Sequence, residues 1–553
     1  MALIEADWWL YIAIAIGVII LLAVNGYILV IYQHPDDKNE AYWPKCLVIL
    51  GMITAQGAIL FLPLDVANNS ANVDCNQSWS DVFCGALDMT LAWNIIFMTI
   101  FVLAMFLIPY TIFFYEEDDT AVLEGAFDFR KTCVTATKYM GCVVIIVALT
   151  LALTFIFLGI TSIPVNEYLT LASLGLPYEQ VALDDFEAFA VTSSNGVSDP
   201  LVVGTPAITA FAKEEVSLQV DFPLYVIALL SFVGWFLFMF FAGLGLSAIP
   251  IDLIRSFTNK PQRLDRGQLA ALEISIQRRC NELIELGELL KSEREEASRA
   301  AQEGSDGFLA RRRRNKRDAN EFNKFKQMVY IIEEDYNQMV ECRDYARKFN
   351  PLRPIIALAM GVVCLVISLL WILHIILYML LSPPATPFLN EYLMLLDNFF
   401  PLFGILTLAI LCLYLLAATI KGCFKFGLRL VWFTLHPMKP NGTYMNSFLF
   451  NVGIVLMCTP AVLQFITQAF ADYTSNAKIN NFFNVQVRYL RFFSYFYANN
   501  VFVIALLLVA LLGGIWLALR PNDLPANPKE VKEALLKMEQ HNERMAGGDS
   551  TRQ

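Results

Sequence analysis

Few ionisable residues lie inside the long apolar segments of this sequence, and two of them could take part in proton or ion chemistry. Asp65 lies at the end of the apolar segment 46–66, next to Pro63, and His374 lies within the apolar segment 355–381. Acids and bases at membrane depth are typical of ion pathways and proton relays. Each also has a structural interpretation, Asp65 as a cap at a membrane interface and His374 as a hydrogen-bonded histidine in a helix bundle.

Signals for enzymatic chemistry are absent from the sequence. Its four histidines lie far apart, and there is no Cys-x-x-Cys pair, no His-Glu-x-x-His motif and no Gly-rich phosphate loop of the Walker type. Such motifs would bring metal ligands or phosphate-binding amides together. The sequence therefore predicts a protein that is neither an enzyme nor an ATP-driven pump, with no cofactor, no metal site and no nucleic-acid partner. Neutral polar residues in the apolar segments are expected to hydrogen-bond between helices, namely Gln56, Asn94, Gln464 and Gln468.

The elements that must position these residues are membrane-spanning helices. The chain has 553 residues, of which 57% are hydrophobic, and its mean hydropathy is +0.53. About 20 apolar residues suffice for one helical crossing of a bilayer. We therefore predict an all-α, polytopic helical membrane protein with about nine transmembrane helices and a cytoplasmic helical hairpin. The predicted spans are 8–32, 46–66, 91–114, 139–163, 223–248, 355–381, 392–420, 447–469 and 501–519.

One long charged segment, residues 250–354, interrupts the apolar chain. Leucine and isoleucine recur in it at the 3–4 spacing of a coiled-coil seam over 269–290, and a second such pattern covers 322–339. We interpret the segment as an antiparallel coiled-coil hairpin. Its tip carries four consecutive basic residues, Arg311, Arg312, Arg313 and Arg314. These are either a solvated face or a site for anionic lipid or a protein partner.

The distribution of basic residues predicts the orientation. If the first residue lies outside the cytoplasm, 36 of the 40 Lys and Arg residues fall in inner segments, as the positive-inside rule favours. The amino terminus is then outside and the carboxyl terminus cytoplasmic. The predicted domains are a first membrane bundle of five spans (1–249, with outer loops 67–90 and 164–222), the hairpin (250–354), a second bundle of four spans (355–519) and a cytoplasmic tail (520–553).

The outer loop 67–90 carries two cysteines and two glycosylation sequons. Cys75 and Cys84 are the only cysteines that fall in predicted outer loops, where thiols oxidise, so we expect them to form a disulfide. Asn68 and Asn76 each begin an Asn-x-Ser sequon. Asn76 is the better acceptor because Asn68 lies close to the membrane.

Two further segments have mixed polar and apolar patterns. Residues 421–445 are predicted to form an inner linker with a short interfacial helix, because Leu428, Val431, Trp432 and Leu435 share a helical face. Aromatic residues gather just before the last span, which is typical of an interfacial belt or of a ligand-facing surface. They are Phe482, Phe483, Tyr489, Phe492, Phe493, Tyr495, Phe496 and Tyr497.

Five short stretches, spread from the first span to the sixth, carry a resemblance to a known family. They read YQHPDD at 32–37, LPLDVAN at 62–68, FFYEEDD at 113–119, LSAIPIDLI at 246–254 and NPLRP at 350–354. With nine spans and a central hairpin, the sequence resembles the LIMR family, the lipocalin-interacting membrane receptor group that also includes the limb-region protein. The tip of the hairpin and the tail lie outside the resemblance.

The resemblance implies a receptor or a transport-associated protein. Members are described as endocytic receptors for lipocalins or as lysosomal membrane proteins needed for cobalamin export. We therefore expect a glycoprotein of the endolysosomal, vacuolar or plasma membrane. It would bind an extracellular or lumenal protein or bulky ligand at its outer face, or a membrane transporter or cytoplasmic partner through its hairpin. The alternatives are a secondary transporter of a small organic ligand such as a vitamin, and a membrane-anchored cytoplasmic scaffold.

Overall fold

The computed structural model describes most of the apolar chain. It covers residues 8–39, 42–70, 87–123, 129–167, 212–258, 266–302, 352–381, 383–426 and 442–519, with isolated positions between 325 and 343 and between 428 and 440. The chain divides into two compact units, Met1–Ile249 with Leu365–Gly514, and Pro250–Cys364 with Ile515–Gln553.

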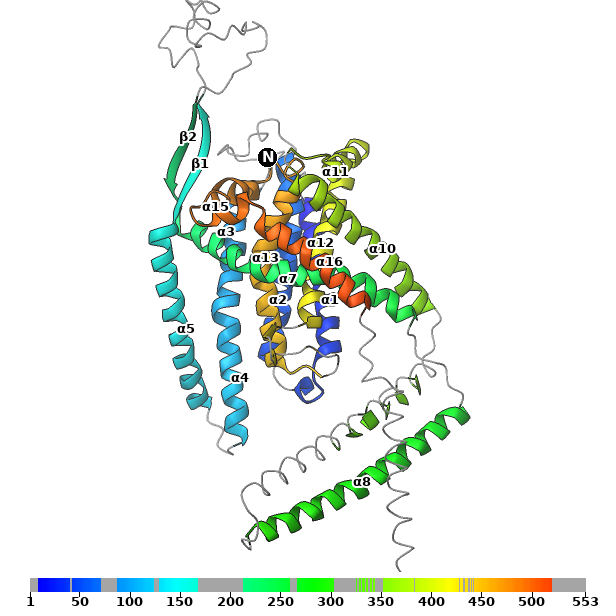
Figure 1. Cartoon of the computed structure of the whole chain (residues 1–553). Helices are drawn as coiled ribbons and strands as arrows, with labels where there is room; N and C mark the ends of the chain where they lie inside the picture. The colour runs from blue at the N-terminus through cyan, green and yellow to red at the C-terminus, as the bar shows by residue number, and fades with distance from the viewer. Residues whose placement is uncertain are drawn as a thin grey trace, which may run out of the picture. The chain divides into compact units, whose positions relative to one another are not determined.

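Helices make up most of the described chain (Figure 1). Nine helical segments in the described ranges are long and apolar enough to cross a membrane, which confirms the predicted fold class and number of spans. The spans are α1 (Trp8–Tyr32), α2 (Tyr42–Ser70), α3 (Met89–Val102) continued through a π-helical turn η3 (Leu103–Leu107) into α4 (Ile108–Leu123), α5 (Phe129–Leu158), α7 (Phe222–Thr258), α10 (Leu352–His374) with the π-helical turn η4 (Ile375–Leu380), α12 (Pro401–Phe426), α13 (Met445–Ala469) and α16 (Val501–Leu519).

The core of the first unit forms around α13. In an apolar 18-residue stretch of this span 89% of the residues are buried, against 11% in the corresponding stretch of α1 and none in that of α5. Helices α2, α4 and α12 contact α13 directly. α13 is less hydropathic than α5, so its central position comes from helix packing and not from a more apolar sequence.

Glycines allow α7 and α12 to meet at backbone contact. A Cβ atom at Gly245 would clash with the carbonyl oxygen of Ala418, and a Cβ atom at Gly422 would clash with that of Phe241. Position 245 thus faces 418 while 241 faces 422, so the two helices run antiparallel. Small residues at such crossings bring helix backbones close enough for van der Waals contact along their length.

The seventh apolar segment, predicted as one span over 392–420, consists of two helices. A short helix, α11 (Phe388–Phe399), ends at Phe400, which has extended backbone angles, and α12 then begins at Pro401. Proline disfavours a helical conformation of the residue before it, so the helix breaks although the apolar pattern continues. The predicted start of this span was therefore wrong.

Two small antiparallel hairpins accompany the helices. Strand β1 (Ile160–Glu167) pairs with β2 (Ala212–Gln219) in a register that places Ile160 opposite Gln219. Strand β3 (Leu428–Leu430) pairs with β4 (Phe433–Leu435), so the interfacial helix predicted there is wrong. The segment is too short to hold a helix without packing partners, and Val431, Trp432, Phe433 and Thr434 are residue types that favour strands.

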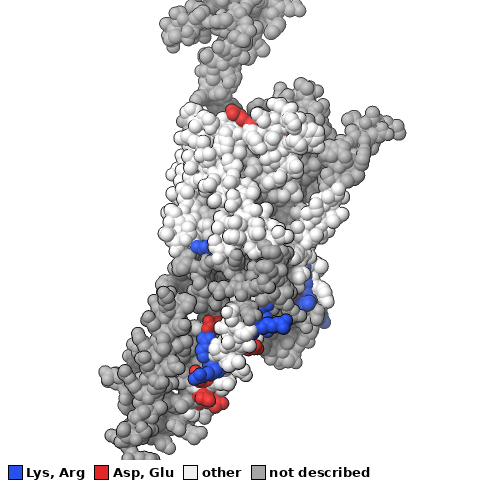
Figure 2. Space-filling model, turned by 90° about the vertical axis from the view of Figure 1, so that its right-hand side faces the viewer, with Lys and Arg blue, Asp and Glu red and all other residues white. Residues whose placement is uncertain are grey.

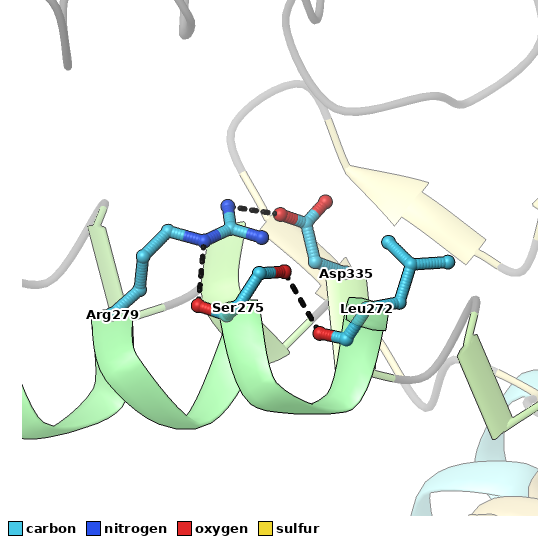
Figure 3. A network of polar contacts seen from close by, with 4 residues as sticks. All are labelled: Leu272, Ser275, Arg279 and Asp335. Carbon is cyan, nitrogen blue, oxygen red and sulfur yellow. Dashed lines mark hydrogen bonds and ion pairs between the residues drawn. The ribbon is translucent and has the colours of Figure 1, made fainter. Parts of the chain in front are cut away.

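Helix α8 (Arg266–Gln302) forms the first arm of the charged hairpin in the second unit. Arg279, which interrupts the seam in the sequence, forms an ion pair with Asp335 of the second arm, with 2.7 Å between Nη1 and Oδ2 (Figure 3). Its Nε also donates to the carbonyl oxygen of Ser275, and the Ser275 hydroxyl donates to that of Leu272. The ion pair therefore joins the arms at the position where the apolar seam is broken.

The direction of the second arm follows from a further contact. A Cβ atom at Gly287 would lie 3.0 Å from the ring of Phe325. Moving forward along α8 from Arg279 to Gly287 thus corresponds to moving backward from Asp335 to Phe325. The arms run antiparallel, as predicted. Arg311, Arg312, Arg313 and Arg314 lie outside the described residues.

Candidate functional site

Asp65 is the centre of a buried polar cluster at the end of α2. Its side chain is fully buried, and its carboxylate accepts hydrogen bonds from Trp93 Nε1 (2.9 Å) and the Ile479 backbone N–H (3.0 Å) at Oδ2, and from Asn69 Nδ2 (2.9 Å) at Oδ1. The charge of Lys478 adds a favourable interaction. Since hydrogen bonds to charged groups each contribute about 1.5–3 kcal/mol, the cluster fixes two other chain segments, α3 and the segment after α13, to one carboxylate of α2.

One of these segments is the connector, residues 470–500, which links α13 to α16. It contains α14 (Lys478–Asn480), the π-helical segment η5 (Asn481–Val487) and α15 (Phe493–Ala498). The backbone of the connector also bonds to β1: the Ser162 N–H donates to the Tyr489 carbonyl, and the Arg491 N–H donates to the Ile160 carbonyl. The connector is thus an ordered cover over one end of the first unit.

A second carboxylate, Asp397 of α11, holds the connector from another direction. The Tyr473 hydroxyl donates to Asp397 Oδ2 at 2.6 Å, and the Gly404 N–H of α12 donates to Oδ1 at 2.9 Å. Burial, together with the hydrogen bond to Asp397 and its negative charge, raises the pKa of Tyr473 above its ordinary value. The phenol therefore remains a neutral donor to the carboxylate.

His374 lies beside this second cluster and is fully buried. Its Nε2 lies 2.8 Å from the carbonyl oxygen of Ala469, and its ring is stacked between those of Tyr378 and Phe470. A carbonyl can only accept, so Nε2 carries the proton and donates. These contacts favour the structural interpretation of His374, although its other nitrogen, Nδ1, is buried and has no hydrogen-bond partner among the residues that the structure describes.

Neutral amides join helices in the interior, as predicted for Gln56 and Gln464. Gln56 and Asn25 exchange two hydrogen bonds between α2 and α1, of 2.8 and 3.0 Å. Gln464 Oε1 accepts from the Ser231 hydroxyl (2.6 Å) and from Trp235 Nε1 (2.8 Å), which joins α13 to α7. Buried polar groups require such partners, because an unsatisfied one costs about 1–3 kcal/mol.

Five of the eight residues in the aromatic cluster of the connector fall into a buried set and an exposed set, and the other three are half-buried. Phe483, Phe493 and Tyr497 are buried, and the Phe493 ring stacks on Phe232 of α7 with 4.5 Å between centroids. Tyr495, by contrast, is 68% exposed, and Phe492 is also exposed. The inward set closes the end of the first unit, while the outward set presents aromatic side chains at its surface.

The remaining predicted sites are described only in part. Asn68 Nδ2, the atom that would carry a glycan, donates to Asn69 Oδ1 (3.2 Å) and to the Leu87 carbonyl (3.3 Å), which favours Asn76 as the acceptor. Asn76, Cys75 and Cys84 lie outside the described residues. Within the ranges that are described, no three His, Cys, Asp or Glu side chains gather in a way that could hold a metal ion.

Sequence reasoning missed Asp397, Tyr473 and Asn390. The Tyr473 N–H donates to Asn390 Oδ1 (3.3 Å), and Asn390 Nδ2 donates to the Ala469 carbonyl (3.4 Å) that also bonds to His374. The available signal was the carboxylate Asp397 four residues before Pro401, near enough to the predicted start of a helix to accept a hydrogen bond from its first turn.

The side chains on the outer surface of the spans are mostly apolar, as expected for helices in contact with lipid. Figure 2 shows the described surface of the helical bundle almost free of Lys, Arg, Asp and Glu on the face in view. Large apolar side chains are exposed along α5, among them Ile145, Leu149 and Ile156. With nine spans, this surface defines the class of the protein: a multi-pass integral membrane protein that sits in a lipid bilayer.

Comparison with known proteins then identifies the family. The LMBR1-like membrane protein family matches residues 10–316 and 313–513, and the chain belongs to this family. It is 32% identical to a LIMR family protein of Dictyostelium discoideum over 93% of this chain and 98% of that protein. It is 34% identical to a LIMR family protein of Arabidopsis thaliana over 90% of this chain and 93% of that protein. No solved structure matches the chain.

Proposed function

We propose that this chain is a non-enzymatic membrane receptor or transport-associated protein of the LIMR type, which binds a ligand or partner at the face that the connector covers. The proposal includes an amino terminus outside the cytoplasm, a cytoplasmic carboxyl terminus, and residence in the endolysosomal, vacuolar or plasma membrane. Under this orientation the connector faces the outside or the lumen.

The main observation in support is the exposure of aromatic side chains on an anchored backbone. Phe492 and Tyr495 are exposed, while the connector that carries them is held by Asp65 and Asp397. Tyrosine and phenylalanine supply large contact areas at low entropic cost, and a backbone that is already ordered loses little further entropy on binding. This combination suits recognition of a protein or a bulky ligand.

The second candidate is a secondary transporter, which one observation favours. Within the described part of the chain, His374 Nδ1 is buried without a hydrogen-bond partner, and the π-helical turn η4 begins at the next residue. π-Helical turns are frequent at functional sites. On this hypothesis, His374 would change its hydrogen bonding during a transport cycle.

A flux measurement separates the two candidates. The purified protein in sealed vesicles is given cobalamin, the small ligand that the family resemblance implies, under an imposed proton or sodium gradient. We expect no gradient-driven uptake above that of protein-free vesicles, since Asp65 and His374 have structural contacts. Uptake that disappears in Asp65→Asn or His374→Ala would reject the proposal and favour the transporter.

A binding measurement completes the test. A purified lipocalin, the protein ligand that the resemblance implies, is applied to the protein in lipid nanodiscs. We expect the double variant Phe492→Ser, Tyr495→Ser to bind it more weakly than the parent does. Equal binding by both proteins would show that this face is not the recognition surface.

A further inference from the structure

Helix α11 has three distinct faces. Leu389, Asn390 and Leu393 are buried against the protein. At 100° per residue, Tyr392, Leu395 and Phe399 share a second face, and all three are exposed, Phe399 to 81% and Leu395 to 64%. Glu391 and Asn398, seven residues apart, share a third face that is also exposed and is bordered by the exposed Met394 on the side away from Leu395. In water, a helix that exposes a continuous apolar face beside a polar one is unfavourable, so the apolar face is expected to contact an apolar surrounding.

The exposed apolar face of α11 continues onto α12. The Phe399 ring stacks on Phe403 of α12, with 6.1 Å between centroids. Further along α12, Leu402, Leu406 and Ile410 recur at every fourth position and are exposed as well. Since α12 is a membrane span, this stripe faces acyl chains, and the apolar face of α11 is continuous with it.

The depth of α11 follows from its buried neighbours. The ring of Phe388, at the start of α11, contacts that of His374 at 5.4 Å, and Asn390 bonds to the carbonyl of Ala469. His374 lies six residues before the end of its span, and Ala469 is the last residue of α13. The start of α11 is therefore level with the ends of two spans rather than beyond them.

We propose that α11 is an in-plane interfacial helix, with Tyr392, Leu395 and Phe399 in contact with lipid acyl chains and with Glu391 and Asn398 in water. Its occupant is the bilayer, because the apolar face continues the lipid-facing stripe of a span. A second copy of the chain or a soluble protein partner on this face would be an alternative. This inference does not depend on the proposed receptor function.

Thiol accessibility tests the proposal. Leu395→Cys, Phe399→Cys and the matched control Asn398→Cys are placed singly in lipid nanodiscs that hold one chain each, which excludes a second copy. A charged maleimide reacts with thiolates in water and does not enter the hydrocarbon. Mass mapping of the α11 peptide reads each site separately from the native cysteines. We expect Asn398→Cys to be labelled, and Leu395→Cys and Phe399→Cys to remain unlabelled until SDS is added.

Two other outcomes would overturn the proposal. Rapid labelling of Leu395→Cys and Phe399→Cys would place this face in water, where a soluble partner could reach it. Failure of Asn398→Cys to label before SDS would show that the predicted water-facing side is covered. Folding of each variant is checked by its thermal unfolding midpoint, and Tyr392→Cys provides an additional lipid-facing site if either variant fails to fold.

Discussion

At the scale of single residues, Asp65 is the side chain that binds the connector most directly to the helix bundle. Replacing it by Asn keeps the size of the side chain but removes the charge and turns an NH₂ group toward donors. If the amide oxygen takes the place of Oδ2 and keeps the bonds from Trp93 and the Ile479 backbone N–H, the new NH₂ group faces the Asn69 Nδ2 donor; the opposite amide orientation loses the bonds from Trp93 and Ile479. We expect Asp65→Asn to lower the free energy of unfolding by about 3 kcal/mol, measured as a lower thermal unfolding midpoint in detergent.

Asp88→Asn is the matched control for that substitution. Asp88 caps α3 by accepting from the Leu91 N–H at 3.1 Å, and Asn caps helices about as well as Asp does. Its midpoint should remain close to that of the parent protein. An Asp65→Asn midpoint equal to that of the control would contradict a stabilising role for the carboxylate.

Site residues could be predicted from the sequence where their type is rare in its surroundings. Asp65 and His374 stand out because charged or titratable groups are rare in apolar segments. Asp397 and Tyr473 do not stand out, because polar residues at the ends of spans are common. What joins them is a turn between α11 and α12 and the path of the connector, and neither follows from local sequence.

At the scale of elements, the close contact between α7 and α12 predicts that larger residues at its glycines will destabilise the protein. Gly245→Ala and Gly422→Ala each place a methyl group against a backbone carbonyl of the other helix. We expect each substitution to destabilise the protein by about 1–3 kcal/mol, since the backbones must separate to admit it. The thermal unfolding midpoint measures the effect.

Gly57→Ala serves as the control for these two variants. A Cβ atom at Gly57 of α2 would meet no atom of the described residues within 4 Å. In a helix interior, alanine is favoured over glycine by about 0.5–1 kcal/mol, so Gly57→Ala should be neutral or slightly stabilising. A loss in Gly57→Ala equal to those of the two contact variants would show that the close approach is not the cause.

The elements themselves were largely predictable. Nine long apolar runs identify nine spans, because few alternatives accommodate 20 apolar residues. The break at Phe400 could be anticipated only from Pro401, and the pairing of β3 with β4 only from residue types, since the apolar spacing of that segment also fits a helix. The central place of α13 was not predictable, because all nine runs have similar hydropathy and only packing distinguishes them.

At the scale of the whole molecule, the orientation in the membrane is the prediction to test. With nine spans and 36 of 40 basic residues in predicted inner segments, an amino-terminal tag should be accessible on intact cells or from the lumen. A carboxyl-terminal tag should be accessible only from the cytoplasm. Protease protection of both tags measures this.

Asn76 should carry a glycan, because the predicted orientation places its loop outside the cytoplasm. The loss of this glycan in Asn76→Gln, seen as a lower apparent mass, is an independent check of the orientation.

Two results would contradict the predicted orientation. Accessibility of both tags from the same side would mean that the number of spans is even. Cytoplasmic accessibility of the amino-terminal tag alone would mean that the chain is inverted, and it would also turn the connector toward the cytoplasm.

The backbone contact between α7 and α12 also has a mechanical consequence. Where side chains separate two helices, a change of side-chain rotamer can accommodate a small displacement of one helix. At Gly245 and Gly422 the backbones are in direct contact, and no side chain lies between them that could change its rotamer. The two helices must therefore move together as a single rigid body. Any hinge within the first unit has to lie elsewhere, and the break at Phe400 and the π-helical turn after His374 are the two joints beside the connector.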